Sequence, residues 1–166
     1  MKKVIIIGCP GAGKSTLAME MGKKTGLPVV HLDSLFWLPG WAQRPREEFD
    51  LLLQESLQKD AWIIDGNYGR TIPLRLATCD TVVYLDFPTI VCILGVIRRV
   101  ITNYGKTRVD MGEDCPERFD WEFMKFVWNF NRRERKKLHR ALNENPTKEI
   151  NILRTRRQVR RFLENI

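Results

Sequence analysis

The sequence predicts a single doubly wound α/β domain, in which helices cover both faces of a parallel sheet. Three observations lead to this prediction. The chain has 166 residues, a usual length for one domain. Short runs rich in β-branched residues alternate with longer amphipathic runs, which is the strand–helix order of such folds. The short runs are almost continuously apolar, as expected of strands that are buried on both faces.

Five segments have the composition of buried strands. Each is rich in β-branched or other apolar residues and is bounded by turn-forming or charged residues. The segments span residues 4–7, 29–32, 62–65, 82–86 and 150–153. Because neighbouring parallel strands need a crossover connection, we expect a helix in each gap between them.

Amphipathic segments occupy those gaps and follow the last strand. The predicted helices span residues 14–24, 46–58, 73–77, 89–102, 116–143 and 155–162. The longest begins at Pro116, a residue that the first turn of a helix tolerates, and its aromatic side chains recur every three or four residues. No repeat, low-complexity tract or linker interrupts the pattern, so we expect one domain over residues 1–166.

The loop between the first strand and the first helix has the pattern G-x-x-x-x-G-K-[ST], which occurs here as GCPGAGKS. Glycines let the backbone turn its N–H groups inward, and the helix N-terminus adds partial positive charge. Lys14 can reach the β- and γ-phosphates of a nucleotide, and the Ser15 hydroxyl can bind Mg²⁺. We therefore predict a P-loop NTPase fold that binds ATP or GTP together with Mg²⁺. The predicted nucleotide-binding residues are Gly8, Gly11, Ala12, Gly13, Lys14, Ser15 and Thr16.

Two aspartates stand at the ends of predicted strands. Asp33 follows the second strand and Asp65 ends the third, and ligands of open α/β sheets bind at these carboxyl ends. Asp33 could orient or deprotonate an acceptor hydroxyl, or bind a water of Mg²⁺. Asp65 could hold Mg²⁺ through water, which makes Ser15 and Asp65 the predicted metal residues. The alternative is that both aspartates only cap helices or stabilise turns.

Arginines flank a polar segment in the second half of the chain. Arg98 and Arg99 end one predicted helix, and Arg132 and Arg133 lie on another. The segment between them, residues 103–116, contains glycines and few apolar anchors, so we predict a mobile lid. Phosphoryl transfer needs positive charge around the transferring group, which these arginines could supply. The alternative is that they form a solvated helix face.

These residues and motifs resemble the adenylate kinase-like branch of P-loop kinases. More closely, the chain resembles the bacterial proteins called DNA topology modulation proteins. The resemblance covers nearly the whole chain and is carried by five stretches, HLDSLFWLPGW, WIIDGNYGRT, CPERFDWEF, WNFNRRERKKL and ILRTRRQVRRFL. It implies a five-stranded parallel sheet, the use of ATP and Mg²⁺, and an acceptor-binding region at about residues 33–46.

The resemblance also implies roles for single residues. Arg70 would meet an acceptor phosphate, and the transferring group would lie between Arg98, Arg132 and Arg133. The predicted substrate-binding residues are Asp33, Asp65, Asn67 and Arg70, and the predicted catalytic residues are Lys14, Asp33, Arg98, Arg132 and Arg133. The chain departs from adenylate kinases in residues 34–46, where tryptophans, prolines and a glycine replace a helical clamp. These aromatic side chains either stack on a base or pack in the core.

We predict a kinase that transfers the γ-phosphate of ATP to a nucleotide or to another small acceptor with a hydroxyl or phosphate group. The alternative is an ATP-dependent nucleic-acid-binding protein that modulates DNA topology. Twelve Lys and Arg residues between positions 132 and 161, and a net charge of +8, favour an anionic partner. No sequence motif that reads bases accompanies them. A third alternative is a nucleotide-binding interaction protein without turnover.

Cysteines and apolar runs indicate the compartment. The four cysteines form no CxxC pair, which favours reduced thiols over a zinc site or a disulfide frame. The apolar run near the N-terminus ends early in glycines and a lysine, unlike that of a signal peptide. The run at residues 90–97 is far shorter than the ~18 residues that span a bilayer. We expect a cytoplasmic protein with no membrane association.

Overall fold

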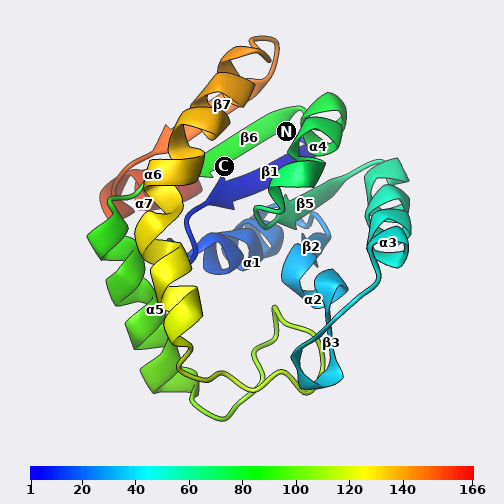
Figure 1. Cartoon of the computed structure of the whole chain (residues 1–166). Coiled ribbons are helices and arrows are strands. Elements are labelled where there is room, and N and C mark those ends of the chain that lie inside the picture. The colour runs from blue at the N-terminus through cyan, green and yellow to red at the C-terminus, as the bar shows by residue number, and fades with distance from the viewer.

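The computed structural model describes all 166 residues and is built on a five-stranded parallel sheet (Figure 1). The strands follow the order β2-β5-β1-β6-β7 across the sheet. Their bounds are β1 (Lys3–Gly8), β2 (Val29–His31), β5 (Trp62–Asp65), β6 (Thr81–Leu85) and β7 (Glu149–Leu153). In the central strand β1, Ile5 pairs with Ile64 on one side and with Val82 on the other. The predicted five-stranded parallel sheet is confirmed.

Seven helices surround the sheet. They are α1 (Lys14–Thr25), α2 (Leu32–Phe36), α3 (Arg46–Gln58), α4 (Ile72–Thr78), α5 (Thr89–Asn103), α6 (Trp121–Asn143) and α7 (Arg156–Glu164). Helices α1 and α7 contact each other, while α5 packs along α6. The strand order and right-handed crossovers place α1 on one face of the sheet and α3, α4 and the α5–α6 pair on the other. The result is the expected three-layer architecture.

The core lies on both faces of the central strands. Residues 4–7 of β1 are fully buried, as the unbroken apolar run predicted. Helix α1 covers them with Leu17, Ala18 and Met21, which recur on one face of the helix. Each such leucine or methionine contributes about 1.5–3 kcal/mol by its burial. The sheet therefore holds the loop after β1 at a rigid edge.

The acceptor-binding region predicted at residues 33–46 contains small elements that the sequence did not indicate. Leu32 begins helix α2 and is buried, so β2 ends one residue earlier than expected. A short hairpin follows, made of β3 (Trp37–Leu38), a 3₁₀ turn η1 (Pro39–Trp41) and β4 (Ala42–Gln43). Phe36 anchors the region through an edge-to-face contact with Phe49 of α3, with ring centroids 5.6 Å apart.

Helix α6 begins at Trp121 and not at Pro116, as we expected. Asp120 is its N-cap, and its carboxylate accepts a hydrogen bond from Phe123 N at 3.0 Å. Pro116 instead forms an antiparallel bridge with Thr107. The next residue, Glu117, is 4% exposed because arginines surround it. This extended stretch replaces the first predicted turn.

The segment between α5 and α6, residues 104–120, contains turns and isolated bridges but no helix. It crosses the open end of the molecule and lies against the β3–β4 hairpin (Figure 1). Three hydrogen bonds join the two, from Gly40 N to Asp114 O (2.9 Å), from Trp41 Nε1 to Pro116 O (3.2 Å) and from Cys115 Sγ to Leu38 O (3.3 Å). The predicted lid and the predicted acceptor-binding region are thus in direct contact.

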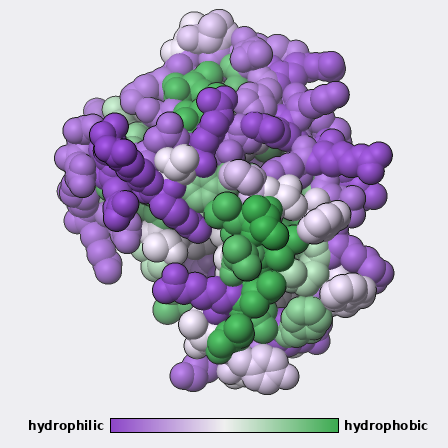
Figure 2. All heavy atoms as spheres, turned by 90° about the vertical axis from the view of Figure 1, so that its left-hand side faces the viewer, coloured by the Kyte–Doolittle hydropathy of each residue, from purple (hydrophilic) through white to green (hydrophobic).

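The outer face of α5 is apolar and exposed. Ile90, Leu94, Ile97 and Ile101 follow one another at steps of four, three and four residues, and all four are exposed. Figure 2 shows an apolar patch on this side of the molecule. No helix in the protein combines the length and the apolar character that crossing a membrane requires.

Candidate active site

The loop after β1 has a backbone that only glycine adopts easily. Gly8, Gly11 and Gly13 have φ angles of 145°, 79° and 94°. No side chain caps the N-terminus of α1, so the first N–H groups of this helix stay free for a ligand. Free N–H groups at a helix N-terminus bind phosphate. The geometry is that of an anion-binding loop.

Lys14 occupies the first position of α1 and lines a cavity of about 960 Å³. Its ammonium group donates a hydrogen bond to Cys9 O at 3.3 Å, back across the loop. Burial lowers the pKa of Lys14, and the negative charges of Asp33 and Asp65 act against this shift. The two aspartates predicted to face the loop therefore do lie near its lysine.

Ser15 and Asp65 contact each other at the carboxyl end of β5. The Ser15 hydroxyl donates to Asp65 Oδ2 at 2.8 Å, while Asp65 Oδ1 lies 2.5 Å from His31 Nδ1. Burial lowers the pKa of His31, but the hydrogen bond and charge of Asp65 outweigh it and raise this pKa overall. His31, which sequence reasoning did not single out, therefore fixes the carboxylate that points at Ser15.

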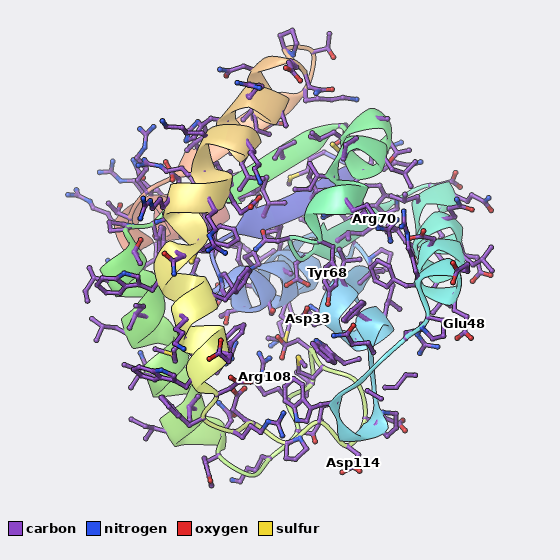
Figure 3. All side chains as sticks on the ribbon, viewed as in Figure 1. Asp33, Glu48, Tyr68, Arg70, Arg108 and Asp114 are labelled. Atoms are coloured by element: carbon purple, nitrogen blue, oxygen red, sulfur yellow. The ribbon has the colours of Figure 1, made fainter.

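Asp33 lies in α2 and lines the same cavity as Lys14. The Tyr68 hydroxyl donates to Asp33 Oδ1 at 2.7 Å, and Figure 3 shows the two side chains together near the centre of the molecule. Burial raises the pKa of Asp33, while the hydrogen bond from Tyr68 and the charge of Lys14 act in the opposite direction. The arrangement is that of an oriented carboxylate with increased proton affinity.

Asn67 and Arg75 hold the loop after β5 against the phosphate loop. Asn67 accepts from Gly8 N at 3.0 Å and donates to Gly8 O at 2.6 Å, so both ends of its amide are engaged within the protein. The fully buried Arg75 donates to Gly66 O, Asn67 O and Thr71 Oγ1. Asn67 was predicted to bind substrate, and the structure shows it bridging two loops.

The predicted catalytic arginines do not reach the cavity. Arg98, Arg132 and Arg133 are exposed, and none of them lines it. Arg99 and Arg108 do line it, and each brings its Nε close to Glu117 Oε2, at 3.1 Å and 2.9 Å. The apolar residues of α5 that face solvent place Arg98 on the outer side of the helix, because a helix turns by 100° per residue. Sequence periodicity could not have separated Arg99 from Arg98, because α5 carries apolar residues on its buried face (Cys92, Val96 and Val100) as well as on its exposed one.

Arg70 does not line this cavity but lines a smaller one beside it, of about 350 Å³, and the two cavities share Phe36, Gln43, Tyr68 and Gly69. Its guanidinium forms a bidentate pair with Asp50 of α3, at 2.9 Å and 2.6 Å. Figure 3 shows Arg70 beside α3, away from Asp33 and Tyr68. The Asp50 carboxylate engages both Nη atoms of Arg70. The role that the resemblance implies for Arg70 stays a prediction.

Arg156, the first residue of α7, reaches the phosphate loop from the other side. It donates to Ala12 O at 2.7 Å, and its guanidinium lies 4.8 Å from the centre of the Phe87 ring. A Cβ on Gly13 would come within 2.6 Å of Arg156 Nη1. Sequence reasoning assigned this arginine to a basic tail, because its contact with Ala12 spans 144 positions of the chain.

A basic cluster lies on the outer side of α6 around Asp86. Asp86 is 3% exposed, and Arg135 Nε approaches its Oδ1 at 2.8 Å. His139 and Arg154 also contact it, at 3.4 Å and 3.5 Å. The carboxylate at the end of β6 thus links α6 to the chain after β7. Arg132, Arg135, His139 and Arg154 line a groove on this outer side of α6.

No protein-family model and no curated protein sequence matches the chain. Solved structures do match. The shikimate kinase from Acinetobacter baumannii, in complex with shikimate, has a TM-score of 0.65 at 14% identity, over 99% of this chain and 90% of that one. The shikimate kinase from Bacteroides thetaiotaomicron has a TM-score of 0.55 at 20% identity, over 98% of this chain and 94% of that one. The chain has the fold of these kinases.

This likeness confirms the predicted P-loop α/β fold over the full length of the chain. Because the identities are only 14–20%, this likeness establishes the fold alone. What these enzymes bind is not transferred to this chain by it. The resemblance to DNA topology modulation proteins finds no matching family model and stays a prediction.

Proposed function

We propose that the protein is an ATP-dependent phosphotransferase that acts on the hydroxyl group of a small molecule. The observation that carries this proposal is that Lys14 and Asp33 line one cavity, of about 960 Å³, that opens on the phosphate loop. An ammonium group for the transferring phosphate and a carboxylate for the acceptor proton are the two groups that this chemistry needs. The fold likeness to kinases with a small-molecule acceptor supports it.

The residues present fit a Mg²⁺ ion. Ser15 and Asp65 place two side-chain oxygens together beside the phosphate loop. Mg²⁺ in kinases is held in this way, by one or two protein oxygens with phosphates and water supplying the rest. When bound, the ion neutralises the phosphate oxygens.

The chain's own residues account for the remaining steps. Backbone N–H groups of the loop and Lys14 bind the β- and γ-phosphates. Tyr68 orients Asp33, which takes the proton of the acceptor hydroxyl as its oxygen attacks the γ-phosphorus. The bond from the γ-phosphorus to the bridging oxygen breaks, and ADP leaves. Arg156, which contacts the phosphate loop, and Arg99 and Arg108, which line the cavity, are the candidates for stabilising this charge.

The test is binding followed by turnover. Calorimetry should detect Mg·ATP, and a hydroxyl-acceptor panel should contain compounds that stimulate ADP release. Lys14→Ala should lower this turnover by about 10²–10³-fold, since it removes a charge that acts on the transition state. Lys23→Ala, an exposed lysine of the same helix, is the control and should leave turnover unchanged.

Absence of Mg·ATP binding at millimolar concentration would overturn the proposal. Binding without stimulation by any acceptor would also overturn it, and would favour a nucleotide-binding protein without turnover. The nucleic-acid alternative depends only on the basic residues between positions 132 and 161, and we do not propose it.

A further inference from the structure

The arginines in the acceptor part of the cavity are largely neutralised by the protein itself. Glu117, which is 4% exposed, contacts both Arg99 and Arg108, and Arg108 also donates to Asp110 at 2.8 Å. The remaining arginine, Arg118, is exposed and lies 5.6 Å from the centre of the Trp41 ring. An anionic acceptor would have to compete with buried carboxylates for its partners.

Carboxylates outnumber cations on the cavity wall. The wall carries five carboxylates, Asp33, Glu117, Asp120, Glu122 and Glu134. It carries four cations, and one of them, Lys14, belongs to the phosphate loop. Glu117 pairs with Arg99 and Arg108, while Glu122 and Glu134 pair with Lys125 and Lys137, so Asp33 and Asp120 are the carboxylates of the wall without an ion pair. A phosphate or carboxylate on the acceptor would find no buried unpaired cation there and would lie near two unpaired carboxylates.

Aromatic rings form two walls of the same cavity. Phe36, Trp37, Trp41 and Tyr68 line the side of α2 and the hairpin. Phe36 contacts Trp37 and Tyr68 with ring centroids 5.0 Å and 5.1 Å apart, so the rings hold one another in place. Phe123, Phe126 and Phe130 of α6 also line the cavity. Aromatic walls with a few fixed polar groups suit a flat or apolar ring.

We propose that the acceptor is an uncharged alcohol that carries a flat or apolar ring, of the chemical class of nucleosides, and not a monophosphate or a carboxylate. This inference rests on the proposed phosphotransferase function. The acceptor oxygen forms the new bond to the γ-phosphorus, its proton passes to Asp33, and ADP carries away the bridging oxygen and its electron pair.

Matched acceptor pairs test this inference. Nucleosides are compared with their 5′-monophosphates, and shikimate with its uncharged methyl ester, in Mg·ATP turnover at equal concentration. The uncharged member of each productive pair should have at least a tenfold higher kcat/KM. Equal values, or a preference for the anion, would overturn the inference while leaving the phosphotransferase proposal intact.

A binding measurement keeps the inference testable without turnover. The same pairs are titrated by calorimetry into the wild-type protein loaded with Mg²⁺ and a non-hydrolysable ATP analogue. The uncharged ring compounds should bind at least tenfold more tightly than their anionic partners. Binding of the anions alone, or of no compound in the panel, would overturn the proposed acceptor class.

Two variants test separately how the cavity discriminates against charge and how it binds the ring. Glu117→Gln should reduce the preference for the uncharged member severalfold, whereas Glu113→Gln, an exposed carboxylate of the same segment, should not. Because Glu117 is buried, thermal unfolding of this variant is measured in parallel.

Phe126→Leu should weaken ring binding severalfold with little risk to folding, since Phe126 is 47% exposed. Trp128→Leu, 63% exposed on the same helix and outside the cavity, is its control. Equal effects of each variant and its control would contradict the proposed binding mode.

Discussion

At the scale of single residues, Asp33 carries most of the proposed chemistry. Burial raises the pKa of its carboxyl group, whereas the hydrogen bond from Tyr68 and the charge of Lys14 act in the opposite direction. A base works best when its pKa lies near the working pH, so the shift favours proton transfer from an alcohol.

The pH dependence of turnover should show this shift. Only the carboxylate accepts a proton, so kcat should fall as the pH drops through the pKa of Asp33. That pKa lies above the ~3.9 of an ordinary aspartate. Tyr68→Phe removes the hydrogen bond that stabilises the carboxylate, so the acid limb should move to higher pH. The measurement is kcat against pH for both proteins; a shift to lower pH would contradict the role of Tyr68.

Asp33→Asn is the matching test of the base itself. It should lower kcat by about 10²–10⁴-fold. The raised pKa means that the folded protein holds this proton more tightly than the unfolded chain, so ionised Asp33 weakens folding at neutral pH. The variant should therefore not unfold at a lower temperature than the wild type. Asp114→Asn, an exposed carboxylate far from Asp33 in Figure 3, should change neither quantity.

Residues of the site differ in how well the sequence predicts them. The phosphate loop is a local pattern, so its residues are recognised from spacing alone. His31, Tyr68 and Arg156 act through contacts that span 34, 35 and 144 positions, and nothing local indicates such contacts. Arg99 could not be told from Arg98 either, because α5 is apolar on its exposed face as well as on its buried face.

At the scale of elements, α5 packs directly on the phosphate loop. A Cβ on Gly95 would lie 2.1 Å from Gly11 O, and a Cβ on Gly11 would lie 2.1 Å from Cys92 O. The helix therefore fixes the outer wall of the phosphate loop. The two residues that meet at this contact, Gly95 and Gly11, are both glycines, which allows the backbones to approach closely.

Gly95→Ala should strain this contact. Because the nearest atom, Gly11 O, belongs to the backbone, either α5 or the phosphate loop must move, and we expect a loss of about 1–3 kcal/mol in the free energy of unfolding. The KM for ATP should rise, since the displaced backbone is the part that binds phosphate. Urea unfolding and steady-state kinetics measure the two effects. Leu94→Ala, whose side chain is 59% exposed, should change neither by a comparable amount. An unchanged KM in Gly95→Ala would mean that α5 does not shape the nucleotide site.

Elements with a strong local signal were predicted well, and those that depend on distant partners were not. The central strands are apolar on both faces, and the predicted strands and observed strands agree within a residue or two at their ends. The β3–β4 hairpin has two residues per strand, too few for a periodic pattern. The start of α6 was misplaced because ion pairs with Arg99 and Arg108, on other parts of the chain, hold Glu117 in an extended stretch.

At the scale of the whole molecule, two regions that were predicted separately form one unit. Segment 104–120 and the β3–β4 hairpin share three hydrogen bonds, and a Cβ on Gly112 would lie 1.9 Å from Trp37 O. The sequence indicated a lid and an acceptor region but not that they touch. A movement of the predicted lid would therefore have to involve the hairpin as well.

This contact predicts that the two segments open together. Trp41→Phe keeps a ring but removes the Nε1–H that donates to Pro116 O, a hydrogen bond whose net contribution is about 0.5–1.5 kcal/mol. Amide hydrogen exchange, read by mass spectrometry, should become about 2–10-fold faster in peptides from both segments, because 1.4 kcal/mol corresponds to a factor of ten. Trp121→Phe, a 63% exposed tryptophan at the start of α6, is the control. Faster exchange in one segment alone would show that each opens independently, and the acceptor would then not be enclosed by a single movement.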